Sequence, residues 1–182
     1  MVPSFFPSMS FTSREFRDAL GLFPTGIAVV TTVDAAGQPA GVTVNSFTSI
    51  SLDPPLILVS LARTSRSLDA FNASSHIAIS LLRHDQRQAS SVFASTTGDR
   101  FGSVRHRPGL GGCPVIEPHL VAFECEVHAR HDGGDHVIVL GKVIALRRPS
   151  DELPRPLLYF RGQYRELSDQ HAEIAPFRLE GW

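Results

Sequence analysis

The chain has 182 residues, of which 42% are hydrophobic and 19% are charged, and its formal net charge is −1. This composition predicts one soluble globular domain and excludes an intrinsically disordered chain, which requires low hydrophobicity together with high net charge. The near-zero charge gives no broad basic field for nucleic acid, and no apolar stretch is long enough to cross a membrane.

The N-terminal segment predicts a lead-in followed by one short helix. Residues 1–11 have no regular pattern and are expected to be flexible, and they lack the basic start and sustained apolar core of a secretory signal. Thr12-Ser-Arg-Glu15 then matches a capping box, with Phe11 and Phe16 spaced for a hydrophobic staple, which predicts a helix over 12–20. Because the chain has only two cysteines and no such signal, we expect a reducing, cytoplasmic location.

The rest of the chain predicts short strands with few helices between them. β-branched and alternating apolar residues indicate most strands, and Asp132–Asp135 is typical of a hairpin turn. The predicted elements are, in order, strands over 27–33, 41–45 and 56–61, a helix from Ser67, a strand over 77–82, a helix over 86–93, strands over 121–127 and 137–146, and a partly extended segment over 156–164. Residues 95–118 are interpreted as a long functional connection. The pattern therefore predicts a mainly β fold with peripheral helices, folded as a small antiparallel barrel.

The common catalytic and metal-binding patterns are missing from the chain. In the strand over 121–127 the apolar residues alternate with Glu124 and Glu126, so we expect Cys125 in the core and both carboxylates on the other face of a half-buried strand. The spacing of these carboxylates does not by itself make a glycosidase pair. The histidines and cysteines show no metal-ligand spacing, and neither a Gly-x-Ser-x-Gly motif nor a Gly-x-Gly-x-x-Gly motif occurs.

The densest polar cluster is Arg63-Thr-Ser-Arg-Ser67, which follows an apolar strand and precedes a helix. Guanidinium groups, hydroxyls and the unpaired N–H groups of a helix N-terminus together suit a phosphate. The alternative is that Ser67 only caps the helix and that the arginines are solvated. Taken alone, the cluster favours this alternative.

Two further segments carry polar groups that suit a ligand. Thr43–Ser51 concentrates hydroxyls and one amide at the end of a strand, where they could bond the polar edge of a heterocycle, although an ordinary edge strand explains them equally well. His136 follows Gly133-Gly134-Asp135 at the start of a strand, where glycines let a ligand approach closely. A solvent-exposed turn histidine is the simpler interpretation of that residue.

Taken in order, these segments resemble the flavin reductase-like split-barrel family, and in particular the small reductase components of two-component flavin-dependent monooxygenases. The resemblance rests on Phe23–Thr32, Gly41–Pro55, Arg63–Ser67, Asp99–Phe101, Gly134–His136 and Tyr159–Tyr164. It implies a Greek-key split β-barrel domain over residues 12–167, with residues 168–182 as a tail outside the pattern.

The resemblance also implies which residues contact each nucleotide. The implied contacts of the flavin, FMN or FAD, are Thr43, Val44, Asn45, Ser46, Ser49, Ser60, Leu61, Ala62, Ser65 and Ser67. The implied contacts of the nicotinamide nucleotide, NADH or NADPH, are His136, Tyr159, Arg161 and Tyr164. No protein nucleophile or general base is required, because hydride transfer from the nicotinamide to the flavin is chemistry of the two nucleotides.

The activity implied by the resemblance is that of an NAD(P)H:flavin oxidoreductase. Such a protein would be a homodimer and would supply reduced flavin by diffusion to a partner monooxygenase. Two alternatives remain open: a split-barrel flavoprotein with tightly bound FMN that acts in electron transfer or as an oxidase, and a non-enzymatic flavin-binding protein. The residues do not choose between FMN and FAD, or between NADH and NADPH.

Overall fold

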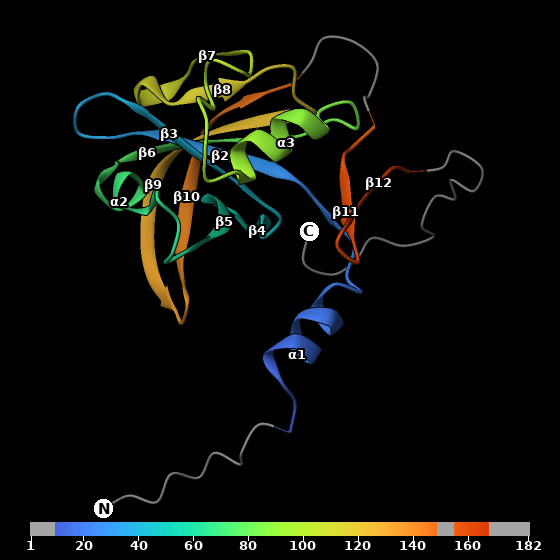
Figure 1. The fold of residues 1–182 in the computed structure, drawn as a ribbon. Helices are drawn as coiled ribbons and strands as arrows, with labels where there is room; N and C mark the ends of the chain where they lie inside the picture. The colour runs from blue at the N-terminus through green and yellow to red at the C-terminus, as the bar shows by residue number, and fades with distance from the viewer. Residues whose placement is uncertain (1–9, 149–154, 168–182) are drawn as a thin grey trace, which may run out of the picture.

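β-strands dominate the computed structural model of the chain, which describes residues 10–148 and 155–167 (Figure 1). The described helices are α1 (Ser13–Leu20), α2 (Leu68–Ala73) and α3 (Arg87–Ala94), and a short 3-10 helix covers Leu110–Gly112. The described strands are β1 (Thr25–Gly26), β2 (Ala28–Val33), β3 (Pro39–Val44), β4 (Thr48–Leu52), β5 (Pro55–Ala62), β6 (His76–Leu81), β7 (His106–Pro108), β8 (Pro114–Ile116), β9 (Val121–Gly133), β10 (His136–Arg147), β11 (Leu158–Phe160) and β12 (Gln163–Arg165). Residues 1–9 of the predicted lead-in and the whole predicted tail, 168–182, lie outside the described residues.

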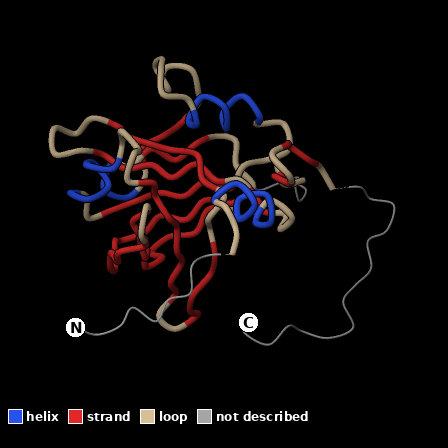
Figure 2. The backbone as a smooth tube through the Cα atoms, turned by 60° about the horizontal axis from the view of Figure 1, so that its bottom comes forward, coloured by secondary structure: helices blue, strands red, loops and turns tan. Residues whose placement is uncertain are grey.

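Seven of the described strands form one antiparallel sheet that curls into a barrel (Figure 2). Its order is β3-β2-β6-β9-β10-β5-β4, so β3 and β4, which are consecutive in the chain, lie at opposite ends of the sheet. The Ser46 hydroxyl, just after β3, accepts a hydrogen bond from the Ser60 N–H of β5 at 2.9 Å and donates to the Ser60 carbonyl at 3.1 Å. One side chain thus closes the seam of the barrel beside the polar segment 43–51.

The barrel interior is packed with apolar side chains from its strands and from α2. The most completely buried members of this cluster, each at most 1% exposed, include Val59, Leu61, Phe71, Ile77 and Val139. Phe71 belongs to α2, so this six-residue helix is held on the barrel by burial of one aromatic ring. A second cluster joins Phe93 of α3 to Ile116 and Leu157, and it fixes α3 outside the barrel.

The predicted mainly β fold with peripheral helices is confirmed. The predicted helix over 12–20 is α1, whose N-cap Thr12 forms the capping box with Glu15, and the rings of Phe11 and Phe16 lie 5.5 Å apart. The prediction of one unstructured connection over 95–118 is wrong, because this segment contains β7 and β8. Each of these strands has only three residues, which is too short to leave a periodic pattern in the sequence.

Glu124 is only 2% exposed, so it is buried where the alternation in β9 predicted an ordinary polar face. The reason is long-range, because the loop before β8 and the end of β10 cover this position. The Glu124 carboxylate accepts hydrogen bonds from the Arg147 guanidinium and from the Leu110 N–H. Burial alone would raise the pKa of Glu124, but these bonds hold that pKa below its usual value. Cys125, by contrast, lies in the core as expected.

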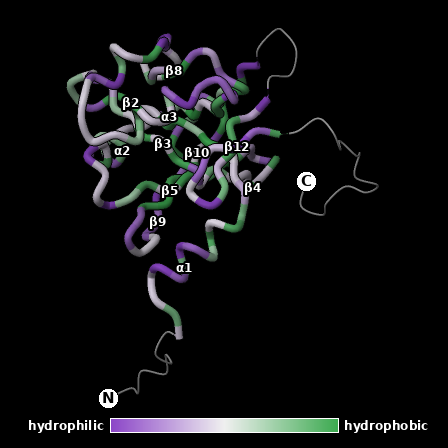
Figure 3. Tube along the Cα trace, turned by 45° about the vertical axis from the view of Figure 1, so that its right-hand side comes forward, coloured by the Kyte–Doolittle hydropathy of each residue, from purple (hydrophilic) through white to green (hydrophobic). Residues whose placement is uncertain are grey.

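Helix α1 stands away from the barrel body and carries both hydrophilic and hydrophobic residues (Figures 1 and 3). None of its residues is buried, and Phe16 and Leu20 are 52% and 59% exposed. The Arg161 N–H donates a hydrogen bond to the Gly21 carbonyl at 2.9 Å, which ties the end of α1 to the β11–β12 turn. Across the described ranges, no helix is long and apolar enough to span a membrane.

Candidate functional site

A hollow of about 970 Å³ lies where α1, the end of β3, the start of β10 and the β11–β12 turn meet; we call it the α1 hollow. Its lining includes the run Arg17–Phe23 and four residues for which the sequence implied a nucleotide contact, namely Asn45, His136, Tyr159 and Arg161. These four come from three separate parts of the chain. The fold therefore brings one implied flavin residue together with three of the four implied nicotinamide residues.

His136 reaches the α1 hollow because of the tight turn between β9 and β10. Gly134 in that turn has a φ of 74°, which an L residue with a side chain rarely adopts. His136 is the first residue of β10 and pairs with Ala62 at the end of β5. Its Nδ1 lies 2.7 Å from the Asp135 carboxylate, and this hydrogen bond lowers the pKa of Asp135. The other ring nitrogen, Nε2, makes no hydrogen bond with any described residue, which leaves it for a ligand.

Arg161 enters the α1 hollow at the tip of the β11–β12 hairpin. Phe160 and Gln163 pair with each other, so the hairpin loop is Arg161-Gly162. Both loop residues have positive φ, 50° and 75°, as a two-residue type I′ turn requires. Arginine in this conformation is strained. The turn nevertheless presents the guanidinium to the hollow, while its backbone N–H is fixed on Gly21.

Tyr164 lies apart from the other implied nicotinamide contacts. Its hydroxyl donates to the Ser90 hydroxyl of α3 at 3.1 Å, and it does not line the α1 hollow. Its ring still meets the ring of Tyr159, with centroids 6.2 Å apart in an edge-to-face arrangement. Tyr164 therefore packs against the ring of Tyr159, and its hydroxyl is already hydrogen-bonded to α3.

Several of the implied flavin residues have side chains that the fold already uses. Val44 and Leu61 are in the barrel core, Ser46 and Ser60 bond across the seam, and the Thr43 hydroxyl donates to the Ser90 carbonyl at 2.7 Å. A flavin beside these residues would meet mainly their backbone. Asn45 is exposed and lines the α1 hollow, while Ser49 is half-buried on the edge strand β4.

The polar cluster 63–67 divides between two places in the structure. The Arg63 guanidinium donates to the Gly134 carbonyl at 2.8 Å and pairs with Asp132, so it clamps the β9–β10 turn. The expectation that Arg63 helps to hold a phosphate is not supported by this geometry. Ser67 is the N-cap residue of α2, as the capping alternative expected, but its side chain makes no capping bond and instead donates to the Gly41 carbonyl at 3.2 Å.

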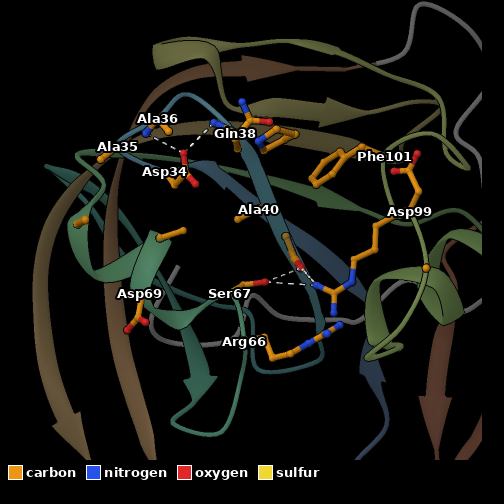
Figure 4. Close-up of a pocket in the computed structure, with 16 residues that line it drawn as sticks. Asp34, Ala35, Ala36, Gln38, Ala40, Arg66, Ser67, Asp69, Asp99 and Phe101 are labelled. Carbon is orange, nitrogen blue, oxygen red and sulfur yellow. Dashed lines mark hydrogen bonds between the residues drawn. The ribbon is translucent and has the colours of Figure 1, made fainter.

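Arg66 and Ser67 line a second hollow, of about 750 Å³, which lies along β3 between α2 and the loop 98–101; we call it the β3 hollow (Figure 4). Arg100 from that loop completes this end of it. The Arg100 guanidinium donates to the Gly41 carbonyl at 2.6 Å and to the Ser67 hydroxyl at 3.3 Å. Gly41 also lets the Phe93 ring of α3 pack against β3, since a Cβ there would come within 2.9 Å of that ring.

Arg66 and Arg100 form an arginine pair that suits a phosphate. Partial burial lowers the pKa of Arg100, and the positive charge of Arg66 lowers it further. Arg66 has no ion pair or hydrogen bond with the described part of the chain. Arg100 donates only to carbonyl and hydroxyl oxygens, of Gly41, Ser67 and Ser95, so neither guanidinium has a carboxylate partner among the described residues. Two neighbouring guanidinium groups of this kind favour an anion between them. Sequence reasoning did not select Arg100 as a site residue, although Asp99-Arg-Phe101 was among the ordered motifs of the resemblance.

The fold and the arginine pair define a β-barrel suited to an anionic ligand, and comparisons with known proteins specify the class. Residues 20–168 match the model of the flavin reductase-like domain. The chain is 39% identical to HsaB, the reductase subunit of a flavin-dependent monooxygenase from Mycobacterium tuberculosis, with 94% of this chain and 91% of that protein covered. It spans only 49% and 60% of the length of two relatives from Rhizobium meliloti, the second being the stachydrine N-demethylase reductase subunit Stc3.

Two solved structures resemble the fold closely. Nitrilotriacetate monooxygenase component B from Mycobacterium thermoresistibile has a TM-score of 0.86 and 40% identity, covering 92% of this chain and 93% of that one. The NADH:FAD oxidoreductase SgcE6 from Streptomyces globisporus, in complex with NAD and FAD fragments, has a TM-score of 0.81 and 34% identity, covering 87% and 94%. The chain belongs to the flavin reductase-like family, and the predicted Greek-key split β-barrel is confirmed.

Proposed function

We propose that this chain is an NADH:flavin oxidoreductase, which passes a hydride from NADH to an oxidised flavin and releases NAD⁺ and reduced flavin. The observation that carries the proposal is the arrangement along β3. Asn45, just beyond the end of the strand, lines the α1 hollow with His136 and Arg161, and Gly41, within the strand, accepts a hydrogen bond from Arg100 of the arginine pair. The HsaB and SgcE6 relatives support the same reading.

The flavin would lie along β3, with its ring near Asn45 and its phosphate at Arg66 and Arg100. Asn45 and Gly41 are separated by four positions, which is about 13 Å of extended chain. A phosphorylated ribityl chain can extend over such a distance. The backbone at the end of β5, Ser60–Ala62, would border the ring, because Ser46 holds this strand end against the end of β3.

The nicotinamide nucleotide would occupy the α1 hollow. His136 Nε2 and the Arg161 guanidinium offer hydrogen bonds and charge to its carboxamide and phosphates, and Tyr159 offers an aromatic face. Hydride transfer is the chemistry of the bound nucleotides, and the protein supplies their orientation and contact. His136 pairs with Ala62, so a nucleotide on His136 would lie next to the flavin ring.

Dimerisation, partner and compartment are further parts of the proposal. A second copy of the chain would cover exposed apolar surfaces on and beside α1 and on β4. These surfaces include Leu22, Phe23 and Leu52, which are 59%, 74% and 72% exposed.

The names of the relatives support a partner monooxygenase that takes up the reduced flavin. The free cysteines Cys113 and Cys125 fit a reducing compartment such as the cytoplasm.

The direct test is oxidation of NADH and NADPH by the purified protein with added FMN, FAD or riboflavin, followed by absorbance at the nicotinamide band. We expect turnover that depends on added flavin and favours NADH. A yellow protein that oxidises NADH without added flavin would favour the tightly bound alternative. Absence of turnover with every donor and flavin would refute the reductase proposal and leave flavin binding as the function to test.

Replacement of Arg66 by glutamine should weaken binding of FMN far more than binding of riboflavin, which has no phosphate. One lost charge-assisted hydrogen bond predicts a rise of about tenfold in the dissociation constant for FMN. Flavin fluorescence titration measures both constants. Arg105→Gln is the control, because Arg105 is 82% exposed and lies away from both hollows. An equal change for FMN and riboflavin would place the phosphate elsewhere.

A further inference from the structure

A third hollow, of about 930 Å³, lies beside β7, on the opposite side of the barrel from α1 (Figure 1); we call it the β7 hollow. Strand β10 begins at His136, in the α1 hollow, and ends at Arg147, in the β7 hollow. Eleven positions separate these two residues, which is about 35 Å of extended strand. The β7 hollow is therefore remote from the proposed nucleotide sites. Five arginines line it, namely Arg83, Arg105, Arg107, Arg147 and Arg148.

Two of these arginines, on and just before β7, share a single carboxylate. The Arg105 Nε lies 3.3 Å from Glu117, and the Arg107 Nε donates to Glu117 at 2.8 Å. One carboxylate balances only one of the two positive charges. Each guanidinium also uses only its Nε with the described residues, so the two terminal nitrogens of each are left for another acceptor.

The other three arginines add to this excess of positive charge. Arg83 donates through two nitrogens to Asp85, which balances its charge. Arg147 donates through its Nε to the buried Glu124, and Arg148 makes no ion pair or hydrogen bond with a described residue. Five guanidinium groups therefore face three carboxylates, which leaves two positive charges in excess, although the net charge of the whole chain is −1.

The β7 hollow is open and has an apolar part, and both features favour a protein surface over a small anion. The side chains of Arg105 and Arg147 are 82% and 45% exposed, whereas a pocket for a small molecule encloses most of its ligand. Leu146, at 46% exposure, and Pro118 lie among the arginines. Arginine and apolar side chains together are typical of contacts between proteins. A small anion would leave this apolar part uncovered.

We propose that the β7 hollow docks an acidic polypeptide segment of a partner protein. Carboxylates of this segment would bind the guanidinium groups of Arg105, Arg107 and Arg148, and an apolar side chain would cover Leu146. The inference rests on the proposed function only for the identity of the partner, which would be the monooxygenase that takes up the reduced flavin. Docking at this end of β10 leaves the α1 hollow open, so nucleotides can exchange while the partner is bound.

The test uses two short labelled peptides, one of alternating glutamate and leucine and one of alternating glutamate and serine. Fluorescence anisotropy with the full chain gives a dissociation constant for each peptide. The double variant Arg105→Gln/Arg148→Gln should raise both constants at least about tenfold, because two charge-assisted contacts are lost. The matched control is Arg14→Gln/Arg165→Gln, which removes the same charge from exposed arginines outside the β7 hollow. It should change neither constant by more than about twofold.

Leu146→Ser tests the apolar contact. The native chain should bind the leucine peptide about threefold to tenfold more tightly than the serine peptide, because the leucine peptide covers Leu146. Leu146→Ser should abolish this difference and leave the constant for the serine peptide unchanged. Oxidation of NADH with free flavin should stay the same in all of these variants, because none of the substituted residues lines the α1 or the β3 hollow. Peptide binding and reductase activity can therefore fail independently of each other.

Four outcomes would overturn the docking proposal. Equal weakening by the two double variants would show a general effect of net charge, and equal affinity of the native chain for the two peptides would remove the apolar contact. Displacement of the leucine peptide by pyrophosphate or citrate at lower concentration than by unlabelled peptide would assign the β7 hollow to a small polyanion. A changed oligomeric state of Arg105→Gln/Arg148→Gln in size-exclusion chromatography would assign this surface to a second copy of the chain.

Discussion

Replacement of His136 by alanine is expected to lower kcat/KM for NADH by about tenfold to a hundredfold, while the dissociation constant for oxidised flavin stays within about twofold. The reason is geometric. Nδ1 is engaged by Asp135, and Nε2 is the ring nitrogen available to a ligand in the α1 hollow. The backbone of residue 136 would still pair with Ala62, so the end of β5 beside the flavin keeps its place. Stopped-flow reduction at varied NADH and a flavin titration measure the two effects separately.

The controls for His136→Ala separate a ligand contact from a structural role. His131→Ala removes an exposed histidine from the same hairpin and should leave both measurements unchanged. Asp135→Asn keeps the imidazole but weakens its orienting partner, so we expect a smaller loss in kcat/KM for NADH than in His136→Ala. Parallel losses in flavin affinity and in NADH-dependent reduction would show that His136 holds the hairpin, and the assignment to the nicotinamide nucleotide would fail.

Local sequence patterns were sufficient to predict most of the barrel. β2, β5 and β6 are rich in apolar and β-branched residues, and α1 carries a complete capping box, so neighbouring residues determine these elements. β7 and β8 depend instead on pairing with each other and on contact with the barrel. Each strand has three residues, one of them a proline at the end of β7 or the start of β8, and so short a segment gives no periodic signal. Their existence follows from tertiary packing rather than from local preference.

The candidate site shows the same limit at the level of single side chains. Within the cluster 63–67, the sequence could not tell that Arg63 would clamp the β9–β10 turn while Arg66 makes no ion pair with the described residues. Arg100 lies 34 positions further along the chain than Arg66, and only the fold brings it to Gly41. The ordered motifs identified the segments correctly. The partner of each guanidinium is decided by strand register and loop packing, which no local pattern contains.

Glu124→Gln is expected to lower the free energy of unfolding at pH 7 by about 2–3 kcal/mol, the largest stability effect proposed for a single polar residue of this chain. The Glu124 carboxylate is 2% exposed, accepts from Arg147 and from the Leu110 N–H, and lies near the charge of Arg107. Glutamine keeps the shape but removes the negative charge, and its single amide oxygen can replace only one of the two carboxylate oxygens that accept from Arg147 and from the Leu110 N–H. Urea unfolding followed by fluorescence measures the difference.

The sign of the pH dependence distinguishes this network from simple packing. Although burial opposes it, hydrogen bonding holds the pKa of Glu124 below its ordinary value of 4.5. A carboxylate with a lowered pKa stabilises the folded state at pH above its unfolded pKa, and this contribution is lost as pH falls through the folded pKa. The difference in free energy of unfolding between the native chain and Glu124→Gln should therefore narrow below about pH 4.5.

Glu126→Gln is the control, because Glu126 is an exposed neighbour of Glu124. This substitution should lower the free energy of unfolding by at most about 0.5 kcal/mol at pH 7. If the difference in free energy of unfolding between the native chain and Glu124→Gln stays constant with pH, the Glu124 side chain stabilises β9 by its volume rather than by its charge.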